Sequence, residues 1–444
     1  MDRRQILKAG AMGTIPSALA ACATSTPMTS ASTHAAVPLS RSPAEILRAA
    51  PPVNLDHARE VMAQERLDGI VVSLPINAYH FSGYWPATSR MGFTPNVTVL
   101  LSRDPQQPIR IVTAEFTYYY LLADLAYAYP AEWFLFMGPG GASLVFEDVG
   151  IEPLPDFERT RRAAVEAATK NQGASPDANT ALLKALRASG LDRGRVAVDS
   201  SAIESSFVRA GLAATVVPAE QTLQRIRLIK SPREMELMRI ASGANVEAAL
   251  AAAATARAGA TYRELRTSFY AEAARRGNRG VFMVIGGMSA EGVDRTLREG
   301  DAFLFDAVSE GAGYHGDFAR TVFVGEPAPS IRRATTAMLL GWDAIRDAMR
   351  PGLRFSEITA LGRETVRKAG FDFLIAFGPH SVGLQHTDAP GLGDVVLEPG
   401  MVISVDCPVM QTGIGGSTHL EDLTLITANG SEPIHRVSAP TIQV

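Results

Sequence analysis

The sequence LFDAVSEGAGYHGDFAR, from Leu304 to Arg320, contains two aspartates eleven residues apart, Asp306 and Asp317. The apolar runs AFLF and FARTVFV predict strands, and EGAG predicts the turn that joins them. A hairpin closed symmetrically between residues 311 and 312 would place the two carboxylates directly opposite each other, with Cβ atoms about 5 Å apart. Such like charges repel, whereas a divalent cation between them reverses the repulsion, because hard cations take oxygen ligands. Two acids flanking an exposed turn are the simpler alternative.

A second pair of acids repeats this arrangement near the C-terminus, in GMVISVDCPVMQTGIGGSTHLEDLTLIT. Asp406 and Glu421 lie on either side of the glycine-rich TGIGG, which predicts a second turn. Between the two pairs, GPHSVGLQHTDAP offers His380 and His386, and imidazole is the usual nitrogen ligand of such metals. Four carboxylates buried together carry a prohibitive desolvation cost unless they are paired. Two divalent ions about 3.5–4 Å apart would neutralise them and activate a water for hydrolysis.

The order of these side chains resembles the ligand set of the pita-bread metallopeptidases, the family of methionine aminopeptidase, aminopeptidase P, prolidase and creatinase. The family order of Asp, Asp, His, Glu, Glu corresponds here to Asp306, Asp317, His380, Asp406 and Glu421. DGIVVSLPINAYHFSGYWP resembles the family's N-terminal domain, and LQRIRLIKSPREMELMRIA resembles its domain junction. GDFARTVFVG resembles the strand of the second aspartate, and EPGMVISVD with HLEDLTLIT resembles the closing hairpin.

The expected fold class is α/β (α+β), in two parts. Residues 44–225 are expected to form a creatinase-like α/β domain, because helix-like AREVMAQERLDG alternates with strand-like IVVSLP, VTVLLS and IRIVTAE. The resemblance implies that residues 226–444 form a pita-bread catalytic domain, a curved antiparallel sheet flanked by helices. SPRE at 231–234 predicts a helix that begins with a capping box and a proline, and Thr261 with Glu264 predicts another capping box.

The resemblance also implies chemistry and partners. Two divalent metal ions are expected as cofactors, Mn, Co, Fe or Zn, with Mn favoured. The implied reaction is metal-activated hydrolysis by an Xaa-Pro aminopeptidase or dipeptidase, which releases the N-terminal residue before proline from a short peptide. A homodimer is expected, in which the N-terminal domain of one subunit closes the site of the other. Aromatic residues in YHFSGYW, 79–85, are the candidate contact, or else ordinary domain core.

Several positions depart from the family's pattern. Asp406 is one methylene shorter than the usual glutamate, His419 replaces an arginine, and residues 281–298 lack a histidine that the family's peptidases have. The two histidines of HSVGLQH are six residues apart instead of seven. His386 is expected to shuttle protons or contact the substrate, with Glu421 or Asp406 sharing the proton transfers. His419 is expected to bind a substrate carboxylate in place of the arginine.

Three neighbouring residues have two interpretations each. His315 shares a strand face with Asp317 and would be an extra ligand or second-layer group, although a surface position is the simpler expectation. Arg320 would orient Asp317 or form a cross-strand ion pair. Cys407 is expected to be a packed core thiol, because it points away from the face of Asp406 in a regular strand.

Two other classes of function stay open. The missing histidine and the altered His419 favour a creatinase-like or lyase-like enzyme that acts on a small non-peptide molecule. A lipid-anchored binding protein with a degenerate site is the other alternative. Fold alone does not separate them, because one fold hosts different chemistries.

Composition and the first residues address location. The chain has 444 residues, 46% hydrophobic, and a net charge of −4, so nothing suggests nucleic-acid binding. Arg3 and Arg4 precede a short apolar stretch and LAAC, which ends at Cys22. Residues 1–22 therefore predict a twin-arginine export signal, with Cys22 as the lipidated residue of a lipoprotein, and residues 23–43 predict a flexible tether. The expected location is periplasmic or membrane-anchored, with membrane contact only through that lipid.

Overall fold

The computed structural model describes residues 41–93, 97–125, 127–138, 153–287 and 292–444. The predicted export signal and all but the last three residues of the predicted tether lie outside these residues. The first described helix, α1 (Pro43–Ala49), begins with a capping box between Ser42 and Glu45. None of the described helices is both long and apolar enough to cross a membrane.

The N-terminal half of the described chain is built on a six-stranded mixed sheet with the order β4-β3-β2-β1-β5-β6. Its strands are β1 (Gly69–Val72), β2 (Val97–Ser102), β3 (Ile109–Ala114), β4 (Ala131–Phe136), β5 (Arg193–Val198) and β6 (Ala213–Pro218). The helices around it are α2 (Leu55–Gln64), α3 (Pro75–Ser82), α4 (Glu115–Thr117), α5 (Asp156–Thr169), α6 (Ala178–Ala188), α7 (Ser201–Arg209) and α8 (Glu220–Leu228), with the short turns η1 (Ala87–Met91), η2 (Tyr118–Leu122) and η3 (Ala123–Leu125).

Alternation along the central strand explains this arrangement. Ile70 and Val72 belong to the core that includes residues of α2 and α3, whereas Val71 belongs to the core that includes residues of α6 and α7. A strand that is apolar on both faces needs helices on both sides. The expected α/β architecture is confirmed.

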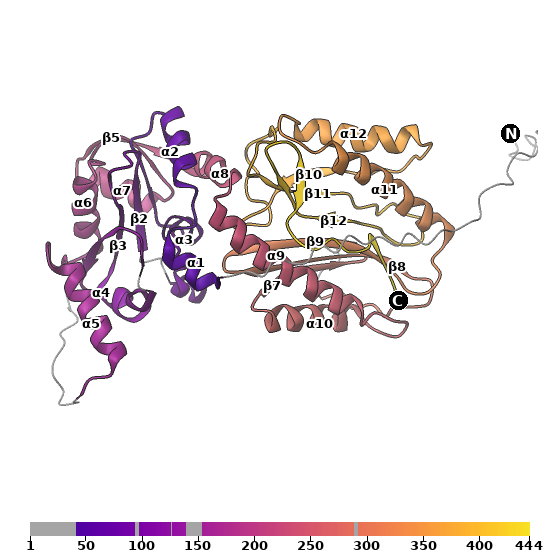
Figure 1. Ribbon diagram of the computed structural model, residues 1–444, viewed down its shortest axis with the longest axis horizontal. Coiled ribbons are helices and arrows are strands. Elements are labelled where there is room, and N and C mark those ends of the chain that lie inside the picture. Colours follow the sequence, from indigo (N-terminus) through magenta and orange to yellow (C-terminus); the bar gives the residue numbers. More distant parts are fainter. Residues whose placement is uncertain (1–40, 94–96, 126, 139–152, 288–291) are drawn as a thin grey trace, which may run out of the picture. The chain divides into compact units, whose positions relative to one another are not determined.

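The C-terminal half places antiparallel strands between two pairs of helices (Figure 1). One sheet has the order β12-β9-β8-β7, with β15 added parallel to β9, and the other has the order β10-β11-β13-β14. The strands are β7 (Arg279–Ile285), β8 (Ala302–Gly311), β9 (Tyr314–Phe323), β10 (Gly378–Ser381), β11 (Val402–Asp406), β12 (Glu421–Asp422), β13 (Thr424–Ile426), β14 (Ser431–Pro433) and β15 (Thr441–Gln443). The helices are α9 (Pro232–Ala253), α10 (Tyr262–Arg275), α11 (Pro329–Ala348) and α12 (Phe355–Lys368).

Both predicted capping boxes are confirmed at the helices that support this half. Ser231 caps α9 and exchanges hydrogen bonds with Glu234, and Thr261 does the same with Glu264 in α10. The predicted domain boundary at residue 226 lies within α8, one short link before α9. The division of the chain at that residue stays a prediction.

The register of the first hairpin differs from the prediction. Val308 pairs with Asp317, and Asp306 pairs with Ala319, so the two aspartates are diagonal neighbours on one face instead of direct partners. The cause is the turn, because Ala312 and Gly313 both have positive φ, 48° and 83°, as a two-residue type I′ turn requires. The hairpin therefore closes one position later than a turn centred between residues 311 and 312. The Tyr79 hydroxyl donates a hydrogen bond to the Ala312 carbonyl and supports this turn.

Candidate metal centre

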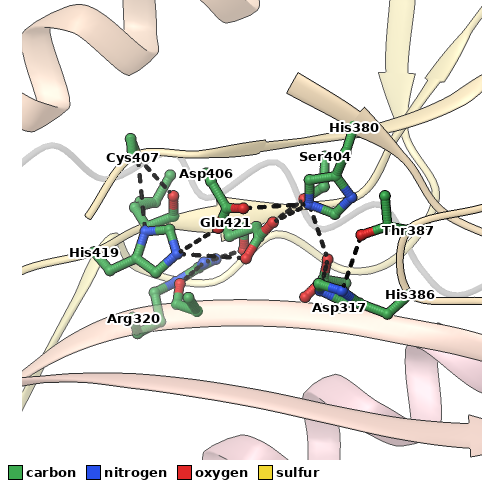
Figure 2. Close-up of polar contacts among 12 residues, drawn as sticks. Asp317, Arg320, His380, His386, Thr387, Ser404, Asp406, Cys407, His419 and Glu421 are labelled. Atoms are coloured by element: carbon green, nitrogen blue, oxygen red, sulfur yellow. Dashed lines mark hydrogen bonds and ion pairs between the residues drawn. The ribbon is translucent and has the colours of Figure 1, made fainter. Parts of the chain in front are cut away.

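Five strands bring the predicted ligands together. Asp306 lies on β8, Asp317 on β9, His380 on β10, Asp406 at the end of β11 and Glu421 at the start of β12. Their side chains form overlapping groups in which the potential ligand atoms lie within 4.8 Å of one another. The structure thus brings together all five residues of the predicted ligand set, from three segments separated in sequence (Figure 2 shows four of them).

The second acidic pair lies on β11 and on the β12–β13 segment, which passes from one sheet to the other. Val402 pairs with Leu425, and Val409 bridges Thr418, which keeps Asp406 and Glu421 in the register that the sequence predicts. Glu421 itself pairs with Ala319 of β9 in the other sheet. Because β12 and β13 are consecutive but belong to different sheets, Glu421 joins the two aspartates of the first hairpin to the residues of β10 and β11.

His380 faces three carboxylates at once. Its Nε2 lies 3.2 Å from Glu421 Oε1, 3.6 Å from Asp406 Oδ2 and 3.7 Å from Asp317 Oδ2. His386 lies on the other side of Asp317, with its Nε2 3.2 Å from Asp317 Oδ2. His380 Nε2 is within hydrogen-bond distance of Glu421 Oε1 and lies near two further carboxylates, so the spacing suits several donor atoms around a shared cation.

Several buried carboxylate oxygens lack a hydrogen bond from any described residue. They are Asp306 Oδ1, both oxygens of Asp317, and Glu421 Oε2. Burial, followed by the charge of Glu421, raises the pKa of both aspartates well above their usual range. Unpaired buried carboxylates are costly, so the donor set fits divalent cations, which would supply the missing positive charge.

The electrostatics of the remaining groups follow the same logic. Although burial opposes it, hydrogen bonding to Glu421 and the surrounding acids raise the pKa of His380 to about 9. Burial pushes the pKa of Glu421 upward, but hydrogen bonding with His380 and the nearby charges of His419 and His380 hold it well below its usual range. In the protein without metal, protonated imidazoles therefore offset charge that cations would otherwise neutralise.

Asp406 reaches both halves of the cluster despite its shorter side chain. Its Oδ2 faces His380 Nε2 at 3.6 Å, and its Oδ1 faces His419 Nε2 at 3.3 Å. The two oxygens thus point to different groups. The Asp406 side chain is 43% exposed, whereas that of Glu421 is 1% exposed.

His419 is buried beside the carboxylates. Its side chain is 2% exposed, and its Nε2 lies 3.4 Å from Glu421 Oε2 as well as close to Asp406. Its substrate-binding role stays a prediction. What the structure shows is an imidazole that faces acids and not the surface.

The structure shows the positions of Arg320, Cys407 and His315, the three neighbouring residues named in the sequence analysis. Arg320 forms a bidentate ion pair with Asp422 at 2.8 and 3.0 Å across the β9–β12 ladder, which confirms the cross-strand alternative. It also donates to the backbone carbonyl of Glu421 at 3.0 Å, so it fixes the position of β12. Cys407 is fully buried and packs in the core beneath β11, as expected. His315 is half-buried in the wall of a pocket and not on the open surface.

Two contacts at the site were not predicted. The Ser404 hydroxyl donates to Glu421 Oε1 at 2.6 Å, and the alternation of β11 could have identified it, since residues 404 and 406 share a face. Phe282 packs edge-on against His386, with ring centroids 5.1 Å apart. Phe282 belongs to the segment in which the predicted family's histidine is absent.

A pocket of about 580 Å³ opens beside the cluster at His386. Its wall combines apolar residues of the N-terminal half with charged and polar residues of the C-terminal half: Pro75, Ile76, Trp85, Arg279, Glu310, His315, Leu384, Gln385, His386 and Thr387. Arg90 packs over Trp85 and pairs with Glu310 at 3.1 Å. The aromatic segment expected at a dimer contact therefore contributes Trp85 to this pocket, while Tyr79 and Phe81 are buried in the chain's own core.

Comparison with known proteins finds a family match over part of the chain. Residues 236–428 match metallopeptidase family M24. The chain is 27% identical over 231 residues to a probable dipeptidase PepE of Mycobacterium tuberculosis, which covers 49% of this chain and 61% of the relative. It is 30% identical over 147 residues to an Xaa-Pro dipeptidase of Lactobacillus delbrueckii, 32% of this chain and 40% of that protein. These matches thus span less than two thirds of the length of either relative.

Solved structures show the same fold over more of the chain. A dipeptidase from Pyrococcus horikoshii superposes with a TM-score of 0.66 at 18% identity, covering 88% of this chain and 99% of that one. An X-Pro aminopeptidase from Thermotoga maritima gives a TM-score of 0.63 at 15% identity, covering 88% and 99%. The fold expected from the ligand motifs is confirmed.

Proposed function

We propose that this chain, whose residues 236–428 match metallopeptidase family M24, is a metal-dependent Xaa-Pro peptidase, a dipeptidase or aminopeptidase that hydrolyses the bond before proline in short peptides. One observation carries the proposal: five ligand side chains converge, and their buried carboxylate oxygens lack hydrogen bonds from the described residues. The dipeptidase names of the relatives support the substrate class.

The proposed ligands are Asp306, Asp317, His380, Asp406 and Glu421, which together would hold two divalent ions. Such ions supply Lewis-acid polarisation of a carbonyl and acidify water at neutral pH. Manganese remains the favoured identity, because four of the five ligands are carboxylates and oxygen ligands suit Mn.

The chain's own residues would position the substrate and move protons. Glu421 is held by Ser404 on one oxygen and by the strand contacts of Arg320, so its carboxylate keeps a fixed orientation. His386 reaches from Asp317 to the pocket and is 30% exposed, which allows it to contact a substrate and to give or take a proton.

The pocket suits a small peptide with charged ends. Its volume of about 580 Å³ lies within the range of ordinary small-molecule sites. Glu310 and Arg279 face each other across 2.5 Å in its wall and offer one group of each sign. Arg279 is 60% exposed and would meet the carboxylate of a short peptide, whereas Glu310 is 9% exposed and already pairs with Arg279 and Arg90.

A non-peptide substrate is the second candidate. Phe282 packs on His386 in a segment that has no histidine, so an apolar ring stands beside the proposed proton carrier. This apolar environment of His386 would suit a reaction on a small molecule that needs fewer proton transfers than peptide hydrolysis does.

Assays on metal-loaded protein separate these candidates. The purified chain would be stripped with chelator and loaded separately with Mn, Co, Fe or Zn, and the bound metal counted. Hydrolysis of Xaa-Pro dipeptides or tripeptides, but not of matched Xaa-Ala peptides, is expected. A sample with two bound ions that cleaves neither Xaa-Pro series would favour the non-peptide substrate, and one that binds no ion would favour a binding protein.

Location and assembly are further parts of the proposal. We propose export through the twin-arginine signal, lipidation at Cys22 and a homodimer in solution. Fractionation of cells that express the wild type, a variant with lysines at Arg3 and Arg4, and Cys22→Ala would test the first two. Light scattering of the purified protein would test the third.

A further inference from the structure

We propose that His419 is a direct metal ligand, so that each of the two cations receives one imidazole. The inference rests on the proposed two-metal function and goes beyond it, because the five-residue ligand set contains a single histidine. It also gives His419 a role other than binding a substrate carboxylate.

The distances around His419 match those around His380. His419 Nε2 lies 3.3 Å from Asp406 Oδ1 and 3.4 Å from Glu421 Oε2, and a carboxylate oxygen of Asp306 belongs to the same group within 4.8 Å. Donor atoms held about 2.1 Å from one cation lie about 3.0 Å apart at a right angle and about 3.4 Å apart at a tetrahedral angle. A charge-assisted hydrogen bond between imidazolium and carboxylate is shorter, about 2.7–2.9 Å. The observed spacing therefore fits ligand atoms around an ion.

The two imidazoles also occupy equivalent positions. Figure 2 shows His419 and His380 on opposite sides of the carboxylates of Asp406 and Glu421. Asp406 directs one oxygen to each ring, and Glu421 does the same, with Oε1 toward His380 and Oε2 toward His419. Two acids that each face both rings are arranged as bridges between two cation positions.

The contact of His419 Nδ1 with Cys407 orients the imidazole ring so that Nε2 points to the carboxylates. Its Nδ1 lies 3.9 Å from Cys407 Sγ, and that thiol donates to the Leu420 carbonyl at 2.8 Å, which leaves the sulfur lone pairs to accept from Nδ1–H. Nε2 is then the ring nitrogen that faces the two carboxylates, so it is the one available to a cation held between them. Burial of the ring, 2% exposed, keeps it from a substrate in the pocket.

A second imidazole would change which metals bind well. Carboxylates suit Mn and Mg, whereas imidazole suits Zn, Fe and other later metals. The centre proposed here has one nitrogen donor for each ion, so Zn, Fe or Co should bind more tightly relative to Mn than the five-residue set alone suggests.

Metal-binding calorimetry on His419→Gln provides the first test. The wild type is expected to bind two Zn²⁺ or Co²⁺ ions, and the variant to bind one of them at least about 100-fold more weakly, since even the partners of ligands contribute 10–100-fold. His57→Gln serves as the matched control, because His57 lies on α2 and contacts the Arg225 carbonyl far from the acids in sequence. Equal affinity of both sites in His419→Gln would overturn the proposal.

Pulsed electron paramagnetic resonance provides a test that does not need the His419 variant to fold. In the Mn²⁺-loaded His380→Gln/His386→Gln variant, coupling to a directly bonded ¹⁴N should persist, because His419 remains. Absence of nitrogen coupling in His380→Gln/His386→Gln would refute the assignment.

The outcomes also separate this inference from the function on which it rests. A raised KM with unchanged metal affinity in His419→Gln would identify a substrate contact and overturn the inference while leaving the two-metal peptidase intact. A wild-type chain that binds no divalent ion would overturn both.

Discussion

Replacing Asp317 with asparagine should stabilise the protein without metal and reduce the stabilisation that metal provides. Asp317 is fully buried, and neither carboxylate oxygen has a hydrogen bond from the described residues. Burial and the charge of Glu421 raise its pKa, so the folded state binds a proton more tightly than the unfolded state. Without metal, the ionised form therefore destabilises the fold, and the cost grows as pH rises.

The magnitude follows from the two unpaired oxygens. An unsatisfied buried polar group costs about 1–3 kcal/mol, and more when it is charged. We expect Asp317→Asn to raise the free energy of unfolding of the chelated protein by about 2 kcal/mol at pH 8. Each ion present at 100 times its Kd stabilises the wild type by about 2.7 kcal/mol, or about 5 kcal/mol for two. In the Asp317→Asn variant, the metal-induced increase in the free energy of unfolding should be half of the wild-type increase or less.

Thermal unfolding at pH 8, with chelator and with saturating metal, measures both effects. About 2 kcal/mol corresponds to a Tm shift of roughly 4–8 °C for a cooperative unit of 150–250 residues. Asp347→Asn is the matched control, because Asp347 is 72% exposed and its substitution should change stability by less than about 0.5 kcal/mol. A chelated Asp317→Asn protein less stable than wild type, or a full metal-induced shift in the variant, would refute the reasoning.

Three further predictions concern the same cluster. Because the pKa of His380 is raised to about 9, its stabilising charge is present below about pH 6.5 and lost as pH rises through 9; urea midpoints of the chelated protein should fall over that window, and an unchanged midpoint would contradict this. Ser404→Ala removes the 2.6 Å hydrogen bond to Glu421 and should weaken metal affinity about 10–100-fold in calorimetry, whereas unchanged affinity would show that Ser404 does not orient the acid. Arg320→Met leaves Asp422 buried without its ion-pair partner and should cost about 3–5 kcal/mol in urea unfolding; the double variant with Asp422→Leu should recover part of that loss, and an additive loss would contradict the pairing.

The convergence of the five proposed ligands was predictable because it depends on residue type, order and strand alternation. Asp306 and Asp317 lie in strands that the apolar runs predict, and the register of Asp406 with Glu421 follows from a glycine-rich turn centred between them. Both capping boxes were predictable because caps depend on neighbours three residues apart. Local chemistry was sufficient in each case.

Other features depend on contacts that sequence spacing does not reveal. The hairpin register was wrong because Ala312, a residue that rarely takes positive φ, adopts it beside Gly313 with support from Tyr79 in a distant helix. The position of His419 depends on β12 pairing with β9 while β13 pairs with β11. Arg320 turned away from Asp317 because three intervening peptide steps place the two on opposite faces of β9.

The most direct test of the two-metal centre is anomalous X-ray diffraction from crystals of the Mn²⁺-loaded or Zn²⁺-loaded protein. Two anomalous peaks about 3.5–4 Å apart are expected among the side chains of Asp306, Asp317, His380, Asp406 and Glu421. No peak within this cluster under saturating metal, or peaks only elsewhere on the chain, would contradict the account.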